Sequence, residues 1–181
     1  EKTLTNEFSA EKPLWDDALN LCRDMQRGDI SSEELMSNIY RRIGAINPYV
    51  NAIVNLLDEE GAMELAVLAD HVPISDRGPL HGIPLAPKDA IAVKGFPTTR
   101  GFAPFAKKIE KEDELLTSRL REAGAIFIGH TNMPEFGLGS NTFNSVFGAT
   151  RNPYDVTRSA GGSSGGAAVA LATKMLPLAD G

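Results

Sequence analysis

The chain has 181 residues, of which 42% are hydrophobic and 23% are charged, so it can form a buried core of ordinary size. This length corresponds to one ordinary domain or to a piece of a larger one. The formal net charge of −6 argues against a protein that binds nucleic-acid backbones, because such proteins present a stripe of basic residues.

The first third of the sequence is predicted to be helical, after a polar arm at residues 1–12 that we expect to be loosely held. Apolar residues at helical spacing predict three helices: from Pro13 to Gly28, from the Ser31–Glu34 capping box to Asn47–Pro48, and over residues 58–71. Their inward faces are expected to include Leu14, Ala18, Leu21, Cys22, Met25, Leu35, Ile39, Ile43, Ile46, Ala62, Leu65, Ala66 and Ala69.

Residues 50–56 alternate only weakly between apolar and polar side chains, so they fit either an edge strand or a bridging loop. The sequence before residue 76 shows no cluster of chemically reactive side chains. We therefore interpret residues 1–75 as a structural N-terminal helical region.

A short buried strand is predicted over Ile83–Pro87, where apolar residues are interrupted by prolines. This strand would carry Lys88 into the interior of the protein. From the residues alone, however, a lysine between Pro87 and Asp89 is more simply explained as a surface charge.

Helix and buried-strand patterns then alternate. An amphipathic helix over residues 113–123, with Leu115, Leu116, Leu120 and Ala123 facing inward, precedes a short apolar strand at Ala125–Gly129. The same pairing is predicted for a helix over 167–174 and a strand over 175–178. A helix that leads into a buried strand is typical of α/β proteins.

The segment between these pairs, residues 131–158, is long and rich in Gly, Asn, Ser and Thr. In a compact domain a connection of this length usually lines a binding site. We therefore expect this segment to border the functional site.

The segment Ser159–Gly166 places four glycines around two adjacent serines, and the small apolar run Ala167–Ala172 follows it directly. Such a segment predicts a tight turn that can approach a ligand closely, followed by a buried helix whose first amides point into the turn. A phosphate loop would require Gly-Lys-Ser/Thr, but Gly166 is followed by alanine. A turn that fixes a serine hydroxyl explains the pattern better than a linker, since linkers do not lead directly into an apolar helix.

Several ordered segments together resemble the amidase signature family. They are Gly82–Asp89, Thr98–Gly101, Thr131–Phe136, Phe147–Gly148, Asn152–Asp155 and Gly161–Ala170. The resemblance covers roughly residue 30 to the end of the chain, and a chance match over so many ordered segments is very unusual. It implies an α/β fold with a mixed central sheet covered by helices, and an amidohydrolase that uses a Ser-cisSer-Lys mechanism with an acyl-enzyme intermediate.

By motif position, the resemblance implies that Lys88 is the catalytic lysine and that Ser163 is the serine after a cis peptide bond, which also contacts the substrate. Burial disfavours the charged form of an amine, so a buried lysine can serve as a base. The backbone of Gly137 and Gly139 resembles the segment that lines the acyl side of the pocket. Support of the loop is expected from Gly161, Gly162, Ser164, Gly165 and Gly166, and support of the wider site from Asp89, Arg100, Asn132, Asn141 and Arg158. His130 stands at a strand end where relatives often have lysine.

In this family the nucleophilic serine lies in a second Gly-Gly-Ser turn, a couple of dozen residues after the first serine of the pair. The sequence ends at Leu178–Gly181, where that turn would begin, so we expect a piece of a longer enzyme with its nucleophile beyond residue 181. Residues 76–181 would be the first part of the α/β core and would form one domain with residues 1–75. Two alternatives stay open: the amidase subunit of a tRNA-dependent amidotransferase, and a non-catalytic binding or scaffold protein.

The remaining features limit cofactors and partners. Cys22 is the only cysteine, so an internal disulfide is impossible and core packing is its simplest role. The three histidines show no zinc-ligand spacing, and we expect neither a metal nor another cofactor. Apolar runs fall short of the roughly 18 residues of a membrane span. We expect a cytoplasmic enzyme that acts on small-molecule linear amides without nucleic-acid or membrane partners, and we leave a homodimer open.

Overall fold

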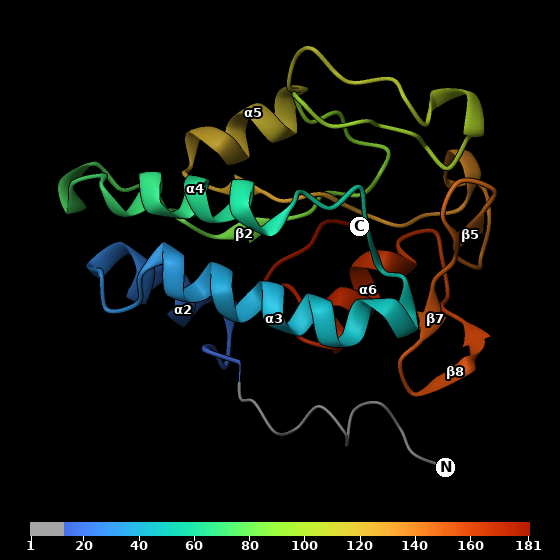
Figure 1. Cartoon of the computed structure of the whole chain (residues 1–181), viewed down its shortest axis with the longest axis horizontal. Helices are drawn as coiled ribbons and strands as arrows, with labels where there is room; N and C mark the ends of the chain where they lie inside the picture. The colour runs from blue at the N-terminus through green and yellow to red at the C-terminus, as the bar shows by residue number, and fades with distance from the viewer. Residues whose placement is uncertain (1–12) are drawn as a thin grey trace.

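The computed structural model of the chain describes residues 13–181, so the arm predicted for residues 1–12 lies outside the described residues. The helices are α2 (Ala18–Arg27), α3 (Ser32–Val50), α4 (Glu59–Asp70), α5 (Leu115–Glu122) and α6 (Gly165–Ala172). The strands are β1 (Ile53–Val54), β2 (Pro84–Leu85), β3 (Ile126–Phe127), β4 (His130–Thr131), β5 (Phe143–Asn144), β6 (Gly148–Ala149), β7 (Arg151–Asn152) and β8 (Asp155–Ser159). Figure 1 shows α3 crossing the middle of the molecule, with α6 near its C-terminal end.

Helix α3 begins where the sequence predicts it but continues past its predicted end. Ser31 Oγ accepts a hydrogen bond from the amide of Glu34, and the Glu34 carboxylate accepts one from the Ser31 amide, which completes the capping box. The expected stop at Asn47–Pro48 is wrong, because the helix runs on to Val50 with Pro48 inside it. A proline in the last turn removes a single backbone donor, and the fully buried Val50 holds this turn against the core.

Burial also differs from the predicted apolar faces in three helices. The N-terminal helix starts at Ala18, capped by the Asp17 carboxylate, and leaves Leu14 43% exposed. In α4 the two alanines Ala62 and Ala66 are buried, while Leu65 is 40% exposed. In α5 the exposed side chains are Leu115 and Leu116, whereas the fully buried residue is Thr117, whose hydroxyl donates to Ala92 O. Cys22 packs against the core as expected, and burial raises the pKa of its thiol.

The centre of the fold is a mixed set of three extended stretches. Strand β2 pairs in parallel with β3, which confirms the predicted buried strand before Lys88, and an isolated parallel bridge extends this pairing from Lys88 to Thr131. Strand β4 pairs antiparallel with β1, so the ambiguous segment 50–56 contains a strand. The stretch that contains β3 and β4 therefore lies between the other two and joins the lysine segment to the N-terminal helices.

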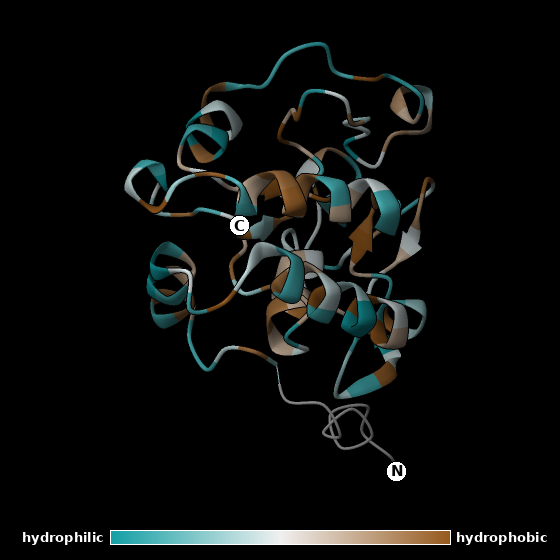
Figure 2. Cartoon of the chain, turned by 60° about the vertical axis from the view of Figure 1, so that its left-hand side comes forward, coloured by the Kyte–Doolittle hydropathy of each residue, from teal (hydrophilic) through white to brown (hydrophobic). Residues whose placement is uncertain are grey.

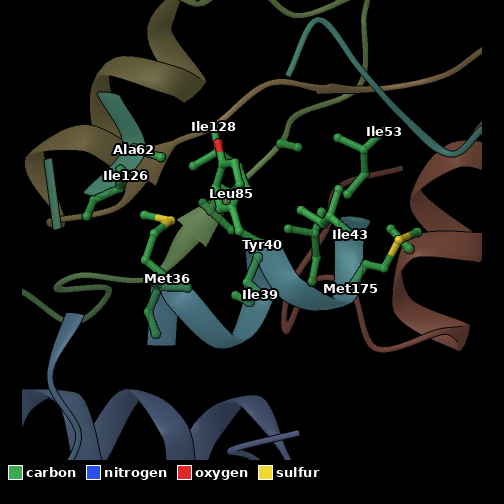
Figure 3. Close-up of a cluster of buried hydrophobic side chains, with 14 of the residues drawn as sticks. Met36, Ile39, Tyr40, Ile43, Ile53, Ala62, Leu85, Ile126, Ile128 and Met175 are labelled. Carbon is green, nitrogen blue, oxygen red and sulfur yellow. The ribbon is translucent and has the colours of Figure 1, made fainter. Parts of the chain in front are cut away.

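The hydrophobic core lies between α3 and these extended stretches. Figure 3 shows Met36, Tyr40 and Ile43 of α3 directed toward side chains of the central strands. The hydroxyl of the buried Tyr40 donates a 2.8 Å hydrogen bond to Leu57 O, which satisfies its polar end. Hydrophilic and hydrophobic residues alternate along individual helices in Figure 2, as expected for helices with one buried face.

The segment from residue 131 to 158 is less irregular than the sequence suggests. Strands β5 and β6 form one antiparallel pair within it, and β7 and β8 form another that continues to Ser159. In contrast, the strand predicted over residues 175–178 is wrong: these residues are irregular, although Met175 and Leu176 are buried. Among residues 13–181, no helix combines the length and the apolar character that a membrane crossing requires.

Candidate active site

The glycine-serine turn is held in place by close backbone packing around α6. The helix begins at Gly165, two residues earlier than predicted, and its second residue, Gly166, has no room for a side chain. A Cβ on Gly166 would lie 2.3 Å from Asn132 N and 2.6 Å from Ala52 O. Instead, the amide of Gly166 donates a 3.0 Å hydrogen bond to Asn132 O. Glycine at this position lets the helix dock directly on the strand stretch that ends at β4.

This packing brings Lys88 to both serines of the turn. Lys88 Nζ lies 2.8 Å from Ser163 Oγ and 2.9 Å from Ser164 Oγ. The Gly162–Ser163 peptide bond is cis, and the Ser163 hydroxyl faces the lysine amine, as the family resemblance implies. All three side chains are half-buried, so the lysine does not project freely into solvent as the residues alone would favour.

The backbone of the lysine segment is fixed by a carboxylate that the sequence analysis did not single out. The amide of Lys88 donates to both carboxylate oxygens of Asp180, at 3.0 and 3.2 Å. The two residues are 92 positions apart, so no local pattern links them. Asp180 thereby ties the segment after α6 to the strand that carries the lysine.

Asp89 supports the turn that follows Lys88. Its buried carboxylate accepts hydrogen bonds from the amide and hydroxyl of Thr99 and a longer one from the amide of Gly101. Burial raises the pKa of the Asp89 carboxyl, and the hydrogen bonds from Thr99 oppose that rise. The expected supporting role of Asp89 therefore has a structural basis in this buried network.

His130 lies beside Asp89 and is completely buried. Its Nε2 is 3.1 Å from Ile91 O, and since a carbonyl only accepts, Nε2 carries the proton. In the part of the chain that the structure describes, Nδ1 has no hydrogen-bond partner. Burial lowers the pKa of this imidazole, and the nearby charge of Asp89 opposes the shift.

The two glycines expected on the acyl side of the pocket differ in their distance from the turn. Gly139 borders it directly, because a Cβ on Gly162 would lie 2.9 Å from Gly139 O. Gly137 closes the 3₁₀ turn η3 (Glu135–Gly137) with φ +73°, and the nearest side chain to it is that of Met133. The geometry thus brings Gly139, but not Gly137, into contact with the turn.

The other expected supports also divide. Asn132 anchors the segment behind the turn, because its Oδ1 accepts from Asn144 Nδ2 at 2.7 Å and its Nδ2 donates to Thr150 Oγ1 at 3.0 Å. Asn141 forms an isolated backbone bridge with Gly161. Arg158 instead pairs with Asp155 on the surface, with its side chain 78% exposed.

The backbone of Arg100 contributes where its side chain was expected to. Its carbonyl accepts from the amide of Phe136, and its own amide donates to Asp89 O. Thr142, buried beneath the turn, was not singled out from the sequence, although its hydroxyl contacts the turn directly.

An amine that contacts two hydroxyls can accept, hold and return a proton, which is what acyl-transfer chemistry requires of its base. Among residues 13–181, no three His, Cys, Asp or Glu side chains gather in a way that could hold a metal ion. The chemistry available to the described groups is therefore proton transfer through Lys88, Ser163 and Ser164.

Comparison with known proteins gives consistent relatives. The chain is 44% identical over 162 residues to a glutamyl-tRNA(Gln) amidotransferase subunit of Azoarcus sp. (strain BH72), which covers 89% of this chain and 33% of that protein. It is 39% identical to the acylamidase of Rhodococcus erythropolis, over 92% of this chain and 35% of that protein. Among solved structures, the native peptide amidase of Stenotrophomonas maltophilia superposes with a TM-score of 0.81 and 33% identity, over 92% of this chain and 36% of that one.

These relatives are about three times as long as the chain, which spans roughly a third of each. They share the α/β fold that the sequence predicts, in which helices cover mixed strand pairs. The family model described as Amidase matches residues 34–181, which include every residue of the lysine-serine site. The chain therefore belongs to the amidase family.

Proposed function

We propose that the protein is an amidohydrolase that cleaves the C–N bond of a linear carboxylic amide by a Ser-cisSer-Lys mechanism. The observation that carries this proposal is the contact of Lys88 Nζ with Ser163 Oγ at 2.8 Å, between residues 75 positions apart in the sequence. A lysine at this distance from a half-buried hydroxyl is placed to move a proton along it. Since the chain spans about a third of its relatives, the activity is proposed for the intact protein expressed from its complete reading frame.

The catalytic sequence follows from the proton path. A nucleophilic serine, which we propose lies beyond residue 181, attacks the amide carbonyl while its proton passes through Ser163 to the Lys88 amine. The same path in reverse delivers the proton to the departing nitrogen, and the C–N bond breaks. Water then attacks the acyl-enzyme, and the carboxylic acid leaves. Backbone at Gly139 would border the acyl group of the substrate, with a weaker case for Gly137.

A second candidate is the amidase subunit of a tRNA-dependent amidotransferase. The observation that favours it is the 44% identity to the Azoarcus protein, compared with 39% to the acylamidase. This relative weighs against the expected absence of a nucleic-acid partner, although the net charge of −6 gives no basic surface for RNA. A stand-alone amidase hydrolyses small amides by itself, whereas an amidotransferase component would require partner proteins and charged tRNA for turnover.

The same proposal includes the organisation and setting of the protein. We propose that residues 1–75 form a helical region in one domain with the α/β part at 76–181; the side chains of α3 and the central strands share one core in support of this. A cytoplasmic location accords with the single cysteine. Assembly as a homodimer is left to measurement of the mass in solution.

The proposal is tested by replacing Lys88 in the intact protein and assaying a panel of small linear amides. Lys88→Ala should reduce turnover by about 10²–10⁴-fold, the usual contribution of a positioned base. Lys88→Arg should fail almost as badly, because a guanidinium stays protonated. Lys94→Ala is the matched control, since Lys94 is exposed and lies six positions along the chain; its turnover should equal that of the wild type.

The two serines extend this experiment. Ser163→Ala removes the proposed proton path and should cost about 10²–10⁴-fold, with a smaller loss on activated esters, whose leaving groups need no proton. Ser164→Ala removes a hydrogen bond to the lysine and should cost roughly 5- to 150-fold. Normal turnover by Lys88→Ala would remove the lysine from the mechanism. An inactive wild type that gains activity only with partner proteins and charged tRNA would favour the second candidate, and one that stays inactive would favour a scaffold.

A further inference from the structure

A buried hydroxyl beneath the glycine-serine turn connects its two ends. Thr142 is completely buried, and its Oγ1 donates a 2.8 Å hydrogen bond to Gly161 O. The same oxygen accepts a 3.0 Å hydrogen bond from the amide of Gly165. Only three residues, Gly162–Ser164, separate these two partners, so one hydroxyl closes the turn that presents both serines to Lys88.

The contact leaves very little free space. A Cβ on Gly165 would lie 2.1 Å from Thr142 Oγ1 and 2.7 Å from Thr142 Cβ. Real Cβ atoms essentially never approach another heavy atom so closely, so the glycine is needed for the hydroxyl to reach the first amide of α6. Thr142 and Gly165 therefore fit together as a pair, and neither can change size without moving the turn.

The threonine is itself held by the strands around it. Its amide donates to Ala160 O at 3.1 Å, and its carbonyl accepts from the amide of Thr150 at 2.9 Å. The residue before it forms a backbone bridge with Gly161, so the segment runs alongside the start of the turn. The hydroxyl thus has a fixed position before any substrate arrives, as a preorganised support requires.

We propose that Thr142 is a positioning residue for the lysine-serine site, which sets the position of Ser163 and Ser164 relative to Lys88 by joining the two ends of the turn. This inference rests on the proposed amidohydrolase function for its kinetic consequence. Thr142 touches neither the lysine nor the serine hydroxyls in the contacts of the described residues, so it acts through Gly161 and Gly165 alone.

Thr142→Val tests this directly, because valine keeps the shape of the side chain and replaces the hydroxyl by a methyl group. The carbonyl of Gly161 and the amide of Gly165 would each lose a buried partner, and the methyl group cannot tolerate the distance that the hydrogen bond allows. A displacement of about 1 Å in catalytic groups can cost on the order of 10²-fold in rate. We therefore expect kcat for a small amide to fall by about 10- to 100-fold, with KM nearly unchanged.

Two further variants separate positioning from general stability. Thr142→Ser keeps the hydroxyl and should restore most of kcat. Thr173→Val is the matched control: Thr173 is also buried and its hydroxyl donates to Val169 O at 2.7 Å, but at the opposite end of α6. It should lower stability without changing kcat, when assays are made well below the unfolding temperature of each variant.

A second readout does not depend on activity. Hydrogen exchange of peptides that cover residues 160–172, followed by mass spectrometry, should speed up around Gly165 in Thr142→Val and stay at the wild-type rate there in Thr173→Val. Unchanged exchange together with unchanged kcat would overturn the positioning role. If the wild type hydrolyses no amide but Thr142→Val still loosens the turn, the proposed function fails while the assignment of Thr142 as the clamp of the turn stands.

Discussion

Two glycines in helices respond oppositely to the same substitution, and the structure gives the sign of each. Helix propensity alone predicts that Gly→Ala stabilises a helix by up to about 1 kcal/mol at any interior position. Gly44 in α3 is exposed, and a Cβ there would meet nothing within 4 Å. Gly44→Ala should therefore raise the free energy of unfolding by up to about 1 kcal/mol.

Gly166→Ala meets a different environment. The new Cβ would lie 2.3 Å from Asn132 N and 2.6 Å from the oxygens of Ala52 and Asn132, all of them main-chain atoms. Relief to an ordinary contact requires a shift of about 1 Å, and overpacking of this kind costs about 1–3 kcal/mol. Loss of the 3.0 Å hydrogen bond from Gly166 to Asn132 adds about 0.5–1.5 kcal/mol. These costs outweigh the propensity gain, and we expect a net destabilisation of about 0.5–3.5 kcal/mol.

The pair is measured by urea unfolding of the intact protein, with wild type, Gly44→Ala and Gly166→Ala prepared alike. Gly166→Ala should have the lower midpoint, with a slope equal to that of the wild type. It should also lose amide turnover, because the shift moves the first turn of α6 and the serines before it. A Gly166→Ala protein as stable as Gly44→Ala would refute the reasoning, since it would mean that the strand next to α6 yields without cost.

Two further predictions concern buried charge and pH. The buried guanidinium of Arg42 donates to the carbonyls of Thr173 and Lys174 at 2.6 and 2.7 Å, just past the end of α6, and Arg42→Lys, which lacks this fork, should lower the free energy of unfolding by about 1–3 kcal/mol in urea titrations; an unchanged midpoint would contradict it. Because burial lowers the pKa of His130, the unfolded state binds more protons below about pH 6.5, and stability should fall as the pH drops through that value. His130→Gln keeps a donor toward Ile91 O without titrating, so its unfolding midpoint should depend less on pH between about 7 and 5 than that of the wild type; parallel curves would exclude this contribution.

The parts of the fold that the sequence predicts are those set by local chemistry. The capping box at Ser31–Glu34 and the buried strand before Lys88 depend on residues close together in the chain, and the structure has both. The predicted burial of Leu115 and Leu116 failed because an apolar residue on a helix says nothing of whether another element covers it. Thr117 is buried instead because its hydroxyl is satisfied by the carbonyls of Ala92 and Glu114, an arrangement without a local pattern.

The site divides in the same way. Lys88 and Ser163 were identified through the family resemblance, whereas the residues around Lys88 alone favoured a surface charge. Asp180 and Thr142 were missed because each acts through backbone groups: Asp180 binds the amide of Lys88, and Thr142 binds the ends of the turn. An aspartate or a threonine that contacts a distant amide carries no signature of its own, so only the folded chain identifies it.

The beginning of α6 explains why both serines can face the lysine. Ser164 stands at the N-cap of the helix, where a serine hydroxyl ordinarily accepts a hydrogen bond from one of the first free amides. Here its side chain caps nothing. The amide of Gly165 is bound by Thr142 Oγ1, and the amide of Gly166 is bound by a main-chain carbonyl of the strand stretch beside it.

Because these first amides are already satisfied from outside the helix, the Ser164 hydroxyl is released from capping and lies 2.9 Å from Lys88 Nζ. The distance from this amine to Ser163 Oγ is 2.8 Å, so proximity to the lysine does not distinguish the two serines. Their difference must come from the group on the far side of each hydroxyl. A relay serine needs a proton donor there, whereas a supporting serine needs only the lysine, and this is why the loss on amides relative to activated esters separates Ser163→Ala from Ser164→Ala.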